Sequence, residues 1–276
     1  MILADVHNHS DFSFDGKASL TEMVCAARKK GLSYFGIAEH FDLDFLAAPF
    51  FYGKTEITQT TNAAAYFTAA RSLQQKANDD RFRLLAGAEF GFHSDERIQD
   101  EFCKIAQTYC PDFIINSVHV CDGTDCMEQN YFTGKRKETA YARYLERVRD
   151  SLDCPYPYDI VAHLGYVSRR AAYPDSKLRY RDFPDLYDCI LKTIVRKEKI
   201  LEINSSARNA GSDFLPDTDI LSRYYELGGR KVSFGSDAHN THRIGDKRET
   251  LTPILKKIGF TFLTIPVCGE HISLYI

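Results

Sequence analysis

Seven short apolar segments recur along this chain of 276 residues, and each is followed by polar residues that can bind a metal ion or a charged substrate. The apolar segments cover residues 2–6, 34–38, 83–88, 113–118, 160–162, 200–203 and 231–234. Stretches with helical spacing lie between most of them, near 19–31, 63–78, 96–109, 137–152, 183–197 and 217–227. Strands that alternate with helices are typical of a parallel sheet covered by helices. We therefore expect an α/β fold, either an open doubly wound sheet or a closed barrel.

The chain shows no internal boundary between domains. Its composition does not shift along its length, and no linker rich in proline or glycine divides it. We therefore expect residues 1–276 to form a single domain. The longest insert, near 41–62, follows the second apolar segment, and long loops in compact domains are often functional. A last apolar stretch covers 260–265.

Charge and composition exclude several classes of partner. The chain has 35 Lys and Arg against 38 Asp and Glu, a net charge of −3, which gives no basic surface for duplex nucleic acid. No segment approaches the ~18 apolar residues of a membrane span, and the first residues lack the pattern of a secretory signal. Eight scattered cysteines are typical of reduced thiols. We expect a cytoplasmic protein that acts on a small molecule, with no nucleic acid and no membrane as partner. The sequence carries no signal for an oligomeric state.

The polar residues that follow the apolar segments form the strongest pattern in the sequence. In chain order they are Asp5, His7 and His9; Glu39 and His40; Glu89; His119; His163; Asn204 and Arg208; and Asp237 and His239. Parallel strands bring their C-terminal ends to one face of a barrel, or to the crevice of an open sheet. A single histidine at a strand end is usually an ordinary polar residue. Seven suitable strand ends in one chain are hard to reach by chance, and we expect these side chains to converge.

The spacing of the first histidines indicates a metal site. His7 and His9 are two residues apart, and alternate side chains of a strand point to the same side. Two such imidazoles can hold one cation, with Asp5 available as a hydrogen-bond partner. Asp237 and His239 repeat the spacing. Imidazole and carboxylate ligands suit zinc, iron or manganese, and there are too many of them for one tetrahedral site. We expect two or three divalent metal ions.

In these motifs the sequence resembles the PHP family, the polymerase and histidinol phosphatase group of metal-dependent phosphoesterases. The matching motifs are Asp5-x-His7-x-His9, Glu39-His40, Gly87-Ala-Glu89, Ser117-Val-His119, His163 and Gly235-Ser-Asp237-Ala-His239. They follow the order of the family and span nearly the whole chain. The resemblance implies a distorted (β/α)7 barrel, similar to a TIM barrel, with a metal site at the C-terminal ends of its strands.

The resemblance also implies a set of nine metal ligands. They are His7, His9, Glu89 and Asp237 for a first ion, His119 and His163 with a bridging Glu89 for a second, and His40, His239 and Asp15 for a third. Many relatives have a histidine where this chain has Asp15. A carboxylate there favours a harder ion such as manganese or iron.

Within the family the chain is similar to the monofunctional histidinol-phosphatases. The similarity lies in its length, the insert after His40, the Ser117-Val-His119 motif, and the segment 201–204 that leads to Arg208. The implied reaction is hydrolysis of L-histidinol phosphate to L-histidinol and phosphate in histidine biosynthesis, by a metal-bound hydroxide. Asp237 and His239 would be catalytic. Arg208 and Arg169 would bind the phosphate, because a guanidinium can form paired hydrogen bonds with phosphate oxygens.

Three other functions remain open from the sequence. The first is a PHP phosphoesterase that acts on a nucleotide or another small phosphomonoester, which would share the metal ligands. The second is an amidohydrolase, but those barrels usually carry a bridging lysine at the fourth strand, where this chain has His119. The third is a PHP-like binding module without activity. Such a module would have lost metal ligands, and Asp15 is the one departure, which can still bind metal.

Overall fold

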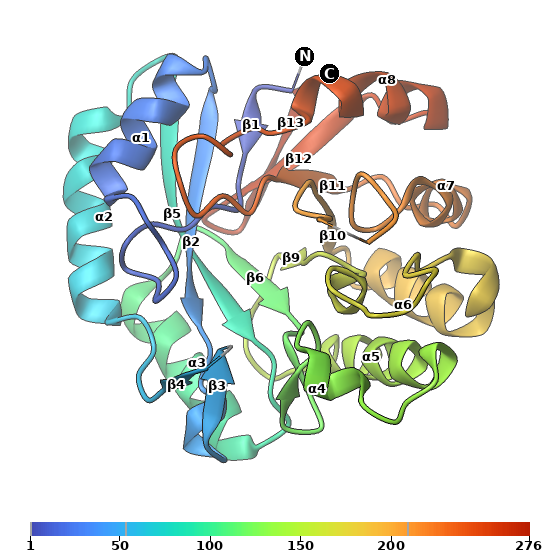
Figure 1. Ribbon diagram of the computed structural model, residues 1–276. Coiled ribbons are helices and arrows are strands. Elements are labelled where there is room, and N and C mark those ends of the chain that lie inside the picture. The colour runs from blue at the N-terminus through green and yellow to red at the C-terminus, as the bar shows by residue number, and fades with distance from the viewer. Residues whose placement is uncertain (1, 53, 209) are drawn as a thin grey trace.

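Seven parallel strands form the centre of the molecule (Figure 1). The computed structural model describes residues 2–52, 54–208 and 210–276. The strands are β1 (Ala4–Asp5), β2 (Tyr34–Phe41), β5 (Arg83–Gly91), β6 (Ile114–Ser117), β9 (Ile160–Val161), β10 (Ile200–Asn204) and β11 (Val232–Gly235). They are neighbours in this same order, and each pair is parallel. All seven predicted strands are therefore confirmed.

The first and last strands approach each other and nearly close the sheet. The backbone N–H of Val6 donates to the carbonyl of Phe234 at 3.0 Å, and the N–H of Asp237 donates to the carbonyl of His7 at 2.8 Å. A parallel bridge also joins Asn8 to Ala238. The expected distorted (β/α)7 barrel is confirmed, and the open doubly wound sheet is wrong. The distortion is visible in the strand lengths, which run from two residues in β1 to nine in β5.

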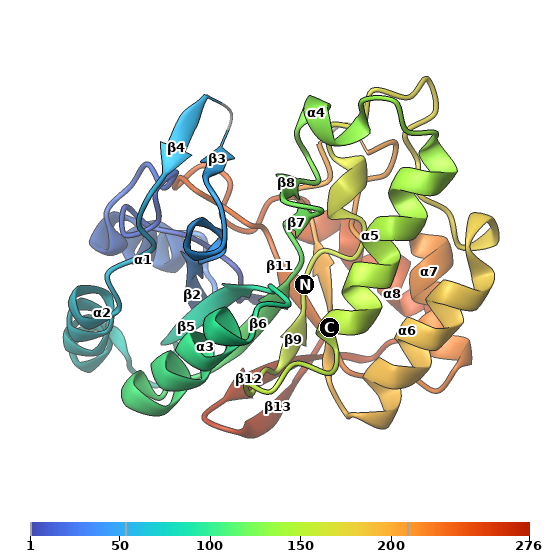
Figure 2. The same cartoon turned by 90° about the horizontal axis from the view of Figure 1, so that it is seen from below.

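Helices surround the barrel on both sides of the view (Figures 1 and 2). They are α1 (Leu20–Lys29), α2 (Ala63–Ala77), α3 (Glu96–Tyr109), α5 (Lys137–Ser151), α6 (Pro184–Arg196), α7 (Thr218–Glu226) and α8 (Arg248–Ile258). The capping box predicted at Ser19 is present, with its side chain accepting from the N–H of Glu22. The six predicted helices are confirmed. Helix α8 was not predicted. It contains Pro253 and begins without a side-chain cap, and both features weaken the sequence signal of a helix.

Two small hairpins and a short helix lie at one end of the barrel. They are β3 (Phe50–Tyr52) with β4 (Thr55–Ile57), and β7 (Val120–Cys121) with β8 (Thr124–Asp125), followed by α4 (Gln129–Phe132). Phe50 and Ile57 of the first hairpin pack against Val120 of the second. Because these segments follow β2 and β6, they stand at the C-terminal ends of the strands, at the top of Figure 2. The insert near 41–62 is therefore an ordered part of the rim.

The remaining elements are a further hairpin and short 3-10 helices. Strands β12 (Phe262–Val267) and β13 (Glu270–Tyr275) form an antiparallel hairpin that includes the last apolar stretch of the sequence. Short 3-10 helices are η1 (Asp44–Leu46), η2 (Tyr166–Ser168) and η3 (Tyr180–Asp182). The eight cysteines form no disulfide bond. Among the described residues, no helix is long and apolar enough to cross a membrane.

The core of the barrel depends on two glycines in neighbouring strands. A Cβ atom at Gly87 in β5 would lie 2.3 Å from Cζ of Phe113, and one at Gly36 in β2 would lie 2.8 Å from the same atom. Phe113 is 1% exposed. Contacts this short do not occur between real carbon atoms, so only glycine leaves room for the Phe113 ring.

Candidate metal centre

The nine side chains predicted to bind metal lie together at the C-terminal ends of the strands. Those that line a single pocket are Asp15, His40, Glu89, His119, His163, Asp237 and His239. His7 and His9 are fully buried behind them, next to Glu89. The convergence that the strand ends predicted is therefore present in the fold. The ligand roles themselves stay a prediction.

The first group of side chains surrounds one oxygen of Glu89. Nε2 of His7 lies 3.4 Å from Oε2 of Glu89, and Nε2 of His9 lies 3.6 Å from the same oxygen. Nε2 of His9 is also 3.4 Å from Oδ1 of Asp237. These four residues match the predicted ligands of the first ion.

The second group surrounds the other oxygen of Glu89. Nε2 of His163 lies 3.0 Å from Oε1 of Glu89, and Nε2 of His119 lies 3.3 Å from it. The two Nε2 atoms are 3.4 Å apart. Since each oxygen of Glu89 faces a different group, the carboxylate is placed to bridge two ions.

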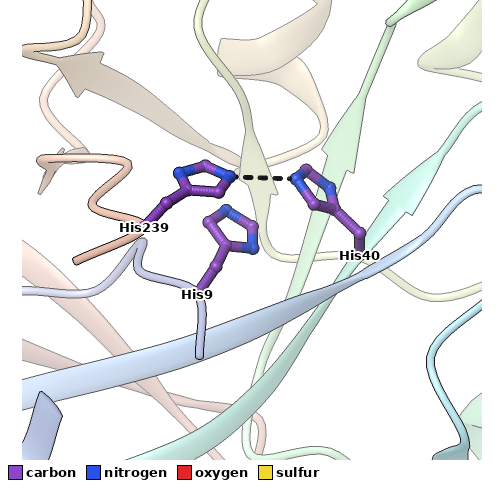
Figure 3. A group of neighbouring side chains, drawn as sticks. All are labelled: His9, His40 and His239. Atoms are coloured by element: carbon purple, nitrogen blue, oxygen red, sulfur yellow. Dashed lines mark hydrogen bonds between the residues drawn. The ribbon is translucent and has the colours of Figure 1, made fainter. Parts of the chain in front are cut away.

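The third group lies nearest the pocket opening, and Figure 3 shows its imidazole rings turned toward one another. Nε2 of His40 is 3.4 Å from Nε2 of His239. Oδ2 of Asp15 is 3.1 Å from Nε2 of His239, and Oδ1 of Asp15 is 3.7 Å from Nε2 of His40. The ring of His9 stacks on those of His40 and His239, with centroids 4.1 and 4.3 Å away. Asp15 therefore lies beside both histidines of this group, as the resemblance predicted.

These atoms fit divalent cations by their chemistry. Among the described residues, Nε2 of His7 and Nε2 of His9 are buried and have no hydrogen-bond partner. A buried polar atom left in this way costs about 1–3 kcal/mol, and a metal ion would satisfy several at once. Burial and the charges of His40 and His239 lower the pKa of His9 well below its usual value. His9 is therefore neutral, and a neutral imidazole is the form that binds metal.

The carboxylate of Glu89 is held in its ionised form. Burial alone would raise the pKa of Glu89, but the charges of His7, His40 and His119 hold it well below its usual value. An ionised Glu89 is the form that a bridging ligand requires.

Hydrogen bonds behind the ligands orient them, and two of the partners were missed from the sequence. Nδ1 of His7 lies 2.6 Å from Oε1 of Glu202. Nδ1 of His119 lies 3.0 Å from Oδ1 of Asp42. Such partners set the tautomer of a ligating imidazole. Glu202 could have been found from the sequence, because a charged residue inside the apolar strand β10 is buried and needs a partner.

The expectation that Asp5 is the partner of these histidines is wrong. Its carboxylate accepts hydrogen bonds from the N–H groups of Ser236 and Gly245, at 2.9 and 2.7 Å. Strand β1 ends at Asp5, so the alternation of a strand does not continue from Asp5 into the histidines. His7 and His9 do stay together, with ring centroids 5.1 Å apart.

Both predicted phosphate-binding arginines line the pocket. Arg169 is buried, and its Nη2 donates to Oδ2 of Asp237 at 2.6 Å and to Oδ1 of Asn204 at 3.1 Å. Its Nε is buried without a partner. Within the described parts of the chain, Arg208 forms no ion pair with a carboxylate, so its charge is available to an anion.

Sequence comparison identifies the family to which the chain belongs. Residues 5–206 match the PHP domain. The chain belongs to the PHP family. This confirms the resemblance that the strand-end motifs indicated.

The curated PHP relatives have similar length. A probable histidinol-phosphatase of Clostridium acetobutylicum is 31% identical over 241 residues, which cover 87% of this chain and 88% of the relative. A probable histidinol-phosphatase of Thermotoga maritima is 28% identical over 269 residues, or 95% of each chain. The histidinol-phosphatase of Lactococcus lactis is 29% identical over 262 residues, covering 93% of this chain and 91% of the relative.

A solved PHP structure supports the fold over the whole chain. The crystal structure of histidinol phosphate phosphatase from Lactococcus lactis, complexed with zinc, L-histidinol and phosphate, superposes with a TM-score of 0.81. The two chains are 26% identical, and the match covers 98% of each. A putative histidinol phosphatase from Listeria monocytogenes, 19% identical, has the same fold with a TM-score of 0.77 and covers 90% of this chain and 99% of its own.

Proposed function

We propose that this chain hydrolyses L-histidinol phosphate to L-histidinol and phosphate, as a metal-dependent phosphomonoesterase. The observation that carries the proposal is the sharing of Glu89 between two ligand groups in one pocket with Arg169 and Arg208. This arrangement suits a phosphate dianion, which needs positive charge on several oxygens at once. The identity of the proposed substrate comes from the relatives that are named histidinol-phosphatase.

Metal ions belong to this proposal. We assign two or three divalent ions to the three ligand groups, with zinc, iron and manganese as the ions to test; the Lactococcus structure contains zinc. When bound, such ions supply positive charge to phosphate oxygens and acidify water at neutral pH. The carboxylate of Asp15 in the third group favours a harder ion there.

The side chains of the chain position the phosphate and hold the ligands. Arg208 presents a free guanidinium to the pocket, and Arg169 presents its unpartnered Nε while its Nη2 holds Asp237. Asp237 and His239 line the pocket, and we assign them as catalytic residues. Burial would raise the pKa of Asp237, but the charge of Arg169 keeps it well below its usual value, so Asp237 stays an anion.

The proposal also covers the cellular location of the protein, its domain organisation and its partners. We place the protein in the cytoplasm, where a small biosynthetic phosphate ester would be available, and treat the chain as one domain. The substrate is a small molecule, and neither nucleic acid nor a membrane takes part.

The test is phosphate release from L-histidinol phosphate and from a panel of other phosphomonoesters that includes a nucleoside monophosphate and p-nitrophenyl phosphate. Each is measured before chelation, after chelation, and after zinc, manganese or iron is restored. We expect a strong preference for L-histidinol phosphate that is lost on chelation and recovered with metal. Metal-dependent activity spread over the panel would refute the substrate and keep the phosphoesterase. Absence of activity with every metal would refute both.

A further inference from the structure

A carboxylate at the end of the β7–β8 hairpin has no role in the metal groups. Asp125 is 4% exposed and lines the same pocket as the ligands. Its Oδ1 accepts from the N–H of Met127 at 2.8 Å, and the hydroxyl of Tyr166 donates to Oδ1 and Oδ2 at 3.2 and 3.3 Å. An ionised carboxylate has about four acceptor positions, so these two neutral donors leave part of its capacity open.

Asp125 is buried without an ion-pair partner among the basic side chains that the structure describes. Burial raises its pKa to about 6, although its hydrogen bonds and the charge of His119 act in the opposite direction. A buried carboxylate without an opposite charge is unfavourable, and the cost disappears when a cation binds. In a pocket open to substrate, the missing charge can come from the substrate.

The other acidic side chains near the pocket either contact a predicted metal ligand, belong to a ligand group or do not line the pocket. Asp42 lies 3.0 Å from Nδ1 of His119 and orients that ligand. Asp15 belongs to the third ligand group. Asp44 is buried but does not line the pocket. Of the described carboxylates that line the pocket, Asp125 is thus the one outside the predicted ligands and their partners, and it has free acceptor capacity.

We propose that Asp125 binds the primary ammonium of an amino-alcohol phosphate and thereby selects the leaving group. The inference rests on the proposed function, because L-histidinol carries an ammonium next to the carbon that bears the ester oxygen. The wall beside Asp125 suits the rest of such a molecule. Phe14, Phe50 and Tyr52 line the pocket, with the rings of Phe14 and Tyr52 5.1 Å apart. Flat apolar surfaces of this kind pack against a heteroaromatic ring.

The experiment separates the amine from the ring. Four substrates are compared: L-histidinol phosphate, L-phenylalaninol phosphate (amine without imidazole), imidazolylpropyl phosphate (imidazole without amine) and p-nitrophenyl phosphate (neither). The variant is Asp125→Asn, which keeps the shape of the side chain and can still accept from Met127. The matched control is Asp122→Asn on the same hairpin, where the carboxylate is exposed and pairs with Arg143.

We expect Asp125→Asn to lower kcat/KM for the two amine substrates about 10- to 100-fold, the range for a lost hydrogen bond to a charged group. The two substrates without an amine should change by no more than about twofold, since they lose no such bond. Asp122→Asn should behave as the unmodified chain with all four. Metal content and Tm, measured on each variant, should stay unchanged.

Other outcomes overturn the proposal in distinguishable ways. A loss that follows the imidazole assigns Asp125 to the ring and refutes ammonium binding. An equal loss with all four substrates makes Asp125 a structural support of the metal groups. If the unmodified chain does not hydrolyse L-histidinol phosphate, the proposed function fails. In that case the comparison of L-phenylalaninol phosphate with p-nitrophenyl phosphate still decides whether Asp125 recognises an amine.

Discussion

Glu202 offers the sharpest test of how the protein holds its metal ligands. Its carboxylate is buried and faces three donors, one of which is the side-chain amide of Asn204, 3.2 Å from Oε2. Oε1 lies 2.6 Å from Nδ1 of His7, and Oε2 accepts the backbone N–H of His163 at 2.6 Å. Because burial alone would raise the pKa of Glu202 but the charge of His7 lowers it, the carboxylate is ionised and accepts from these donors. A metal ion that binds His7 would displace the proton on Nε2, and the remaining proton would stay on Nδ1, where Glu202 accepts it.

The variant Glu202→Gln keeps the shape and replaces one acceptor by a donor. The N–H of His163 can only donate, so the amide oxygen must face it, and the amide nitrogen must face Nδ1 of His7. The imidazole can accept there only if its proton moves to Nε2, the atom that should bind metal. The substitution therefore disfavours the tautomer of His7 that can bind metal, while His7 itself stays in place. We expect metal affinity to fall about 10- to 100-fold. At about 1.4 kcal/mol per factor of ten, this is roughly 1.4 to 2.8 kcal/mol.

The assay is hydrolysis of p-nitrophenyl phosphate against free metal concentration, set with a competing chelator, together with metal content by mass spectrometry. The midpoint should shift to higher metal, while kcat at saturating metal recovers most of its value. Glu226→Gln serves as control, because that exposed carboxylate pairs with Arg223 on the helix surface. An unchanged midpoint in a folded Glu202→Gln protein would show that the contact with His7 does not set its tautomer.

Two further variants test the core and the phosphate site. Gly87→Ala should destabilise the barrel by about 1–3 kcal/mol through overpacking against Phe113, seen as a lower Tm, and adding Phe113→Leu should restore part of the loss; an unchanged Tm would contradict the contact. Arg208→Ala should lower kcat/KM for a phosphomonoester roughly 100-fold at unchanged metal content, as expected when one donor to the reacting group is removed. Unchanged kcat/KM would exclude Arg208 from the phosphate site.

The positions of the seven strands along the chain were predictable because the apolar segments and the polar residues that follow them indicated the same strand ends. Each apolar segment was short, and a polar residue marked where it ended, as at Glu89 and His163. Closure of the barrel was not predictable from the strands alone. It depends on a few backbone contacts, such as Val6 with Phe234, that no side-chain pattern encodes. Helix α8 was missed for a related reason, since Pro253 interrupts the expected composition although the helix forms around it.

The ligand set was predictable as residue types at strand ends, but the contacts between these ligands and their supporting partners were not. Glu202 comes from β10 and reaches His7 after β1, a separation of 195 residues that no local pattern reveals. Asp42 lies in the insert 41–62 with two other acidic residues, Asp44 and Glu56, and only the fold shows that it meets His119. Asp125 likewise becomes notable only when its burial and its lack of an ion-pair partner among the described residues are known.

Backbone strain at the rim gives Glu202 and Arg169 a second role beside the metal groups. His163, Arg208 and Asp237 follow three neighbouring strands, and all three have positive φ, at 20°, 51° and 53°. Such conformations cost about 1–3 kcal/mol each in residues other than glycine and persist only where surrounding contacts hold them. Here the contacts are identifiable. Glu202 holds the N–H of His163, and Arg169 holds Asp237. The strained positions carry two predicted ligands and one predicted phosphate-binding arginine, so the network that stabilises the rim also sets the geometry of the pocket. A substitution that relaxes this network should therefore weaken metal and phosphate binding before it lowers the stability of the barrel.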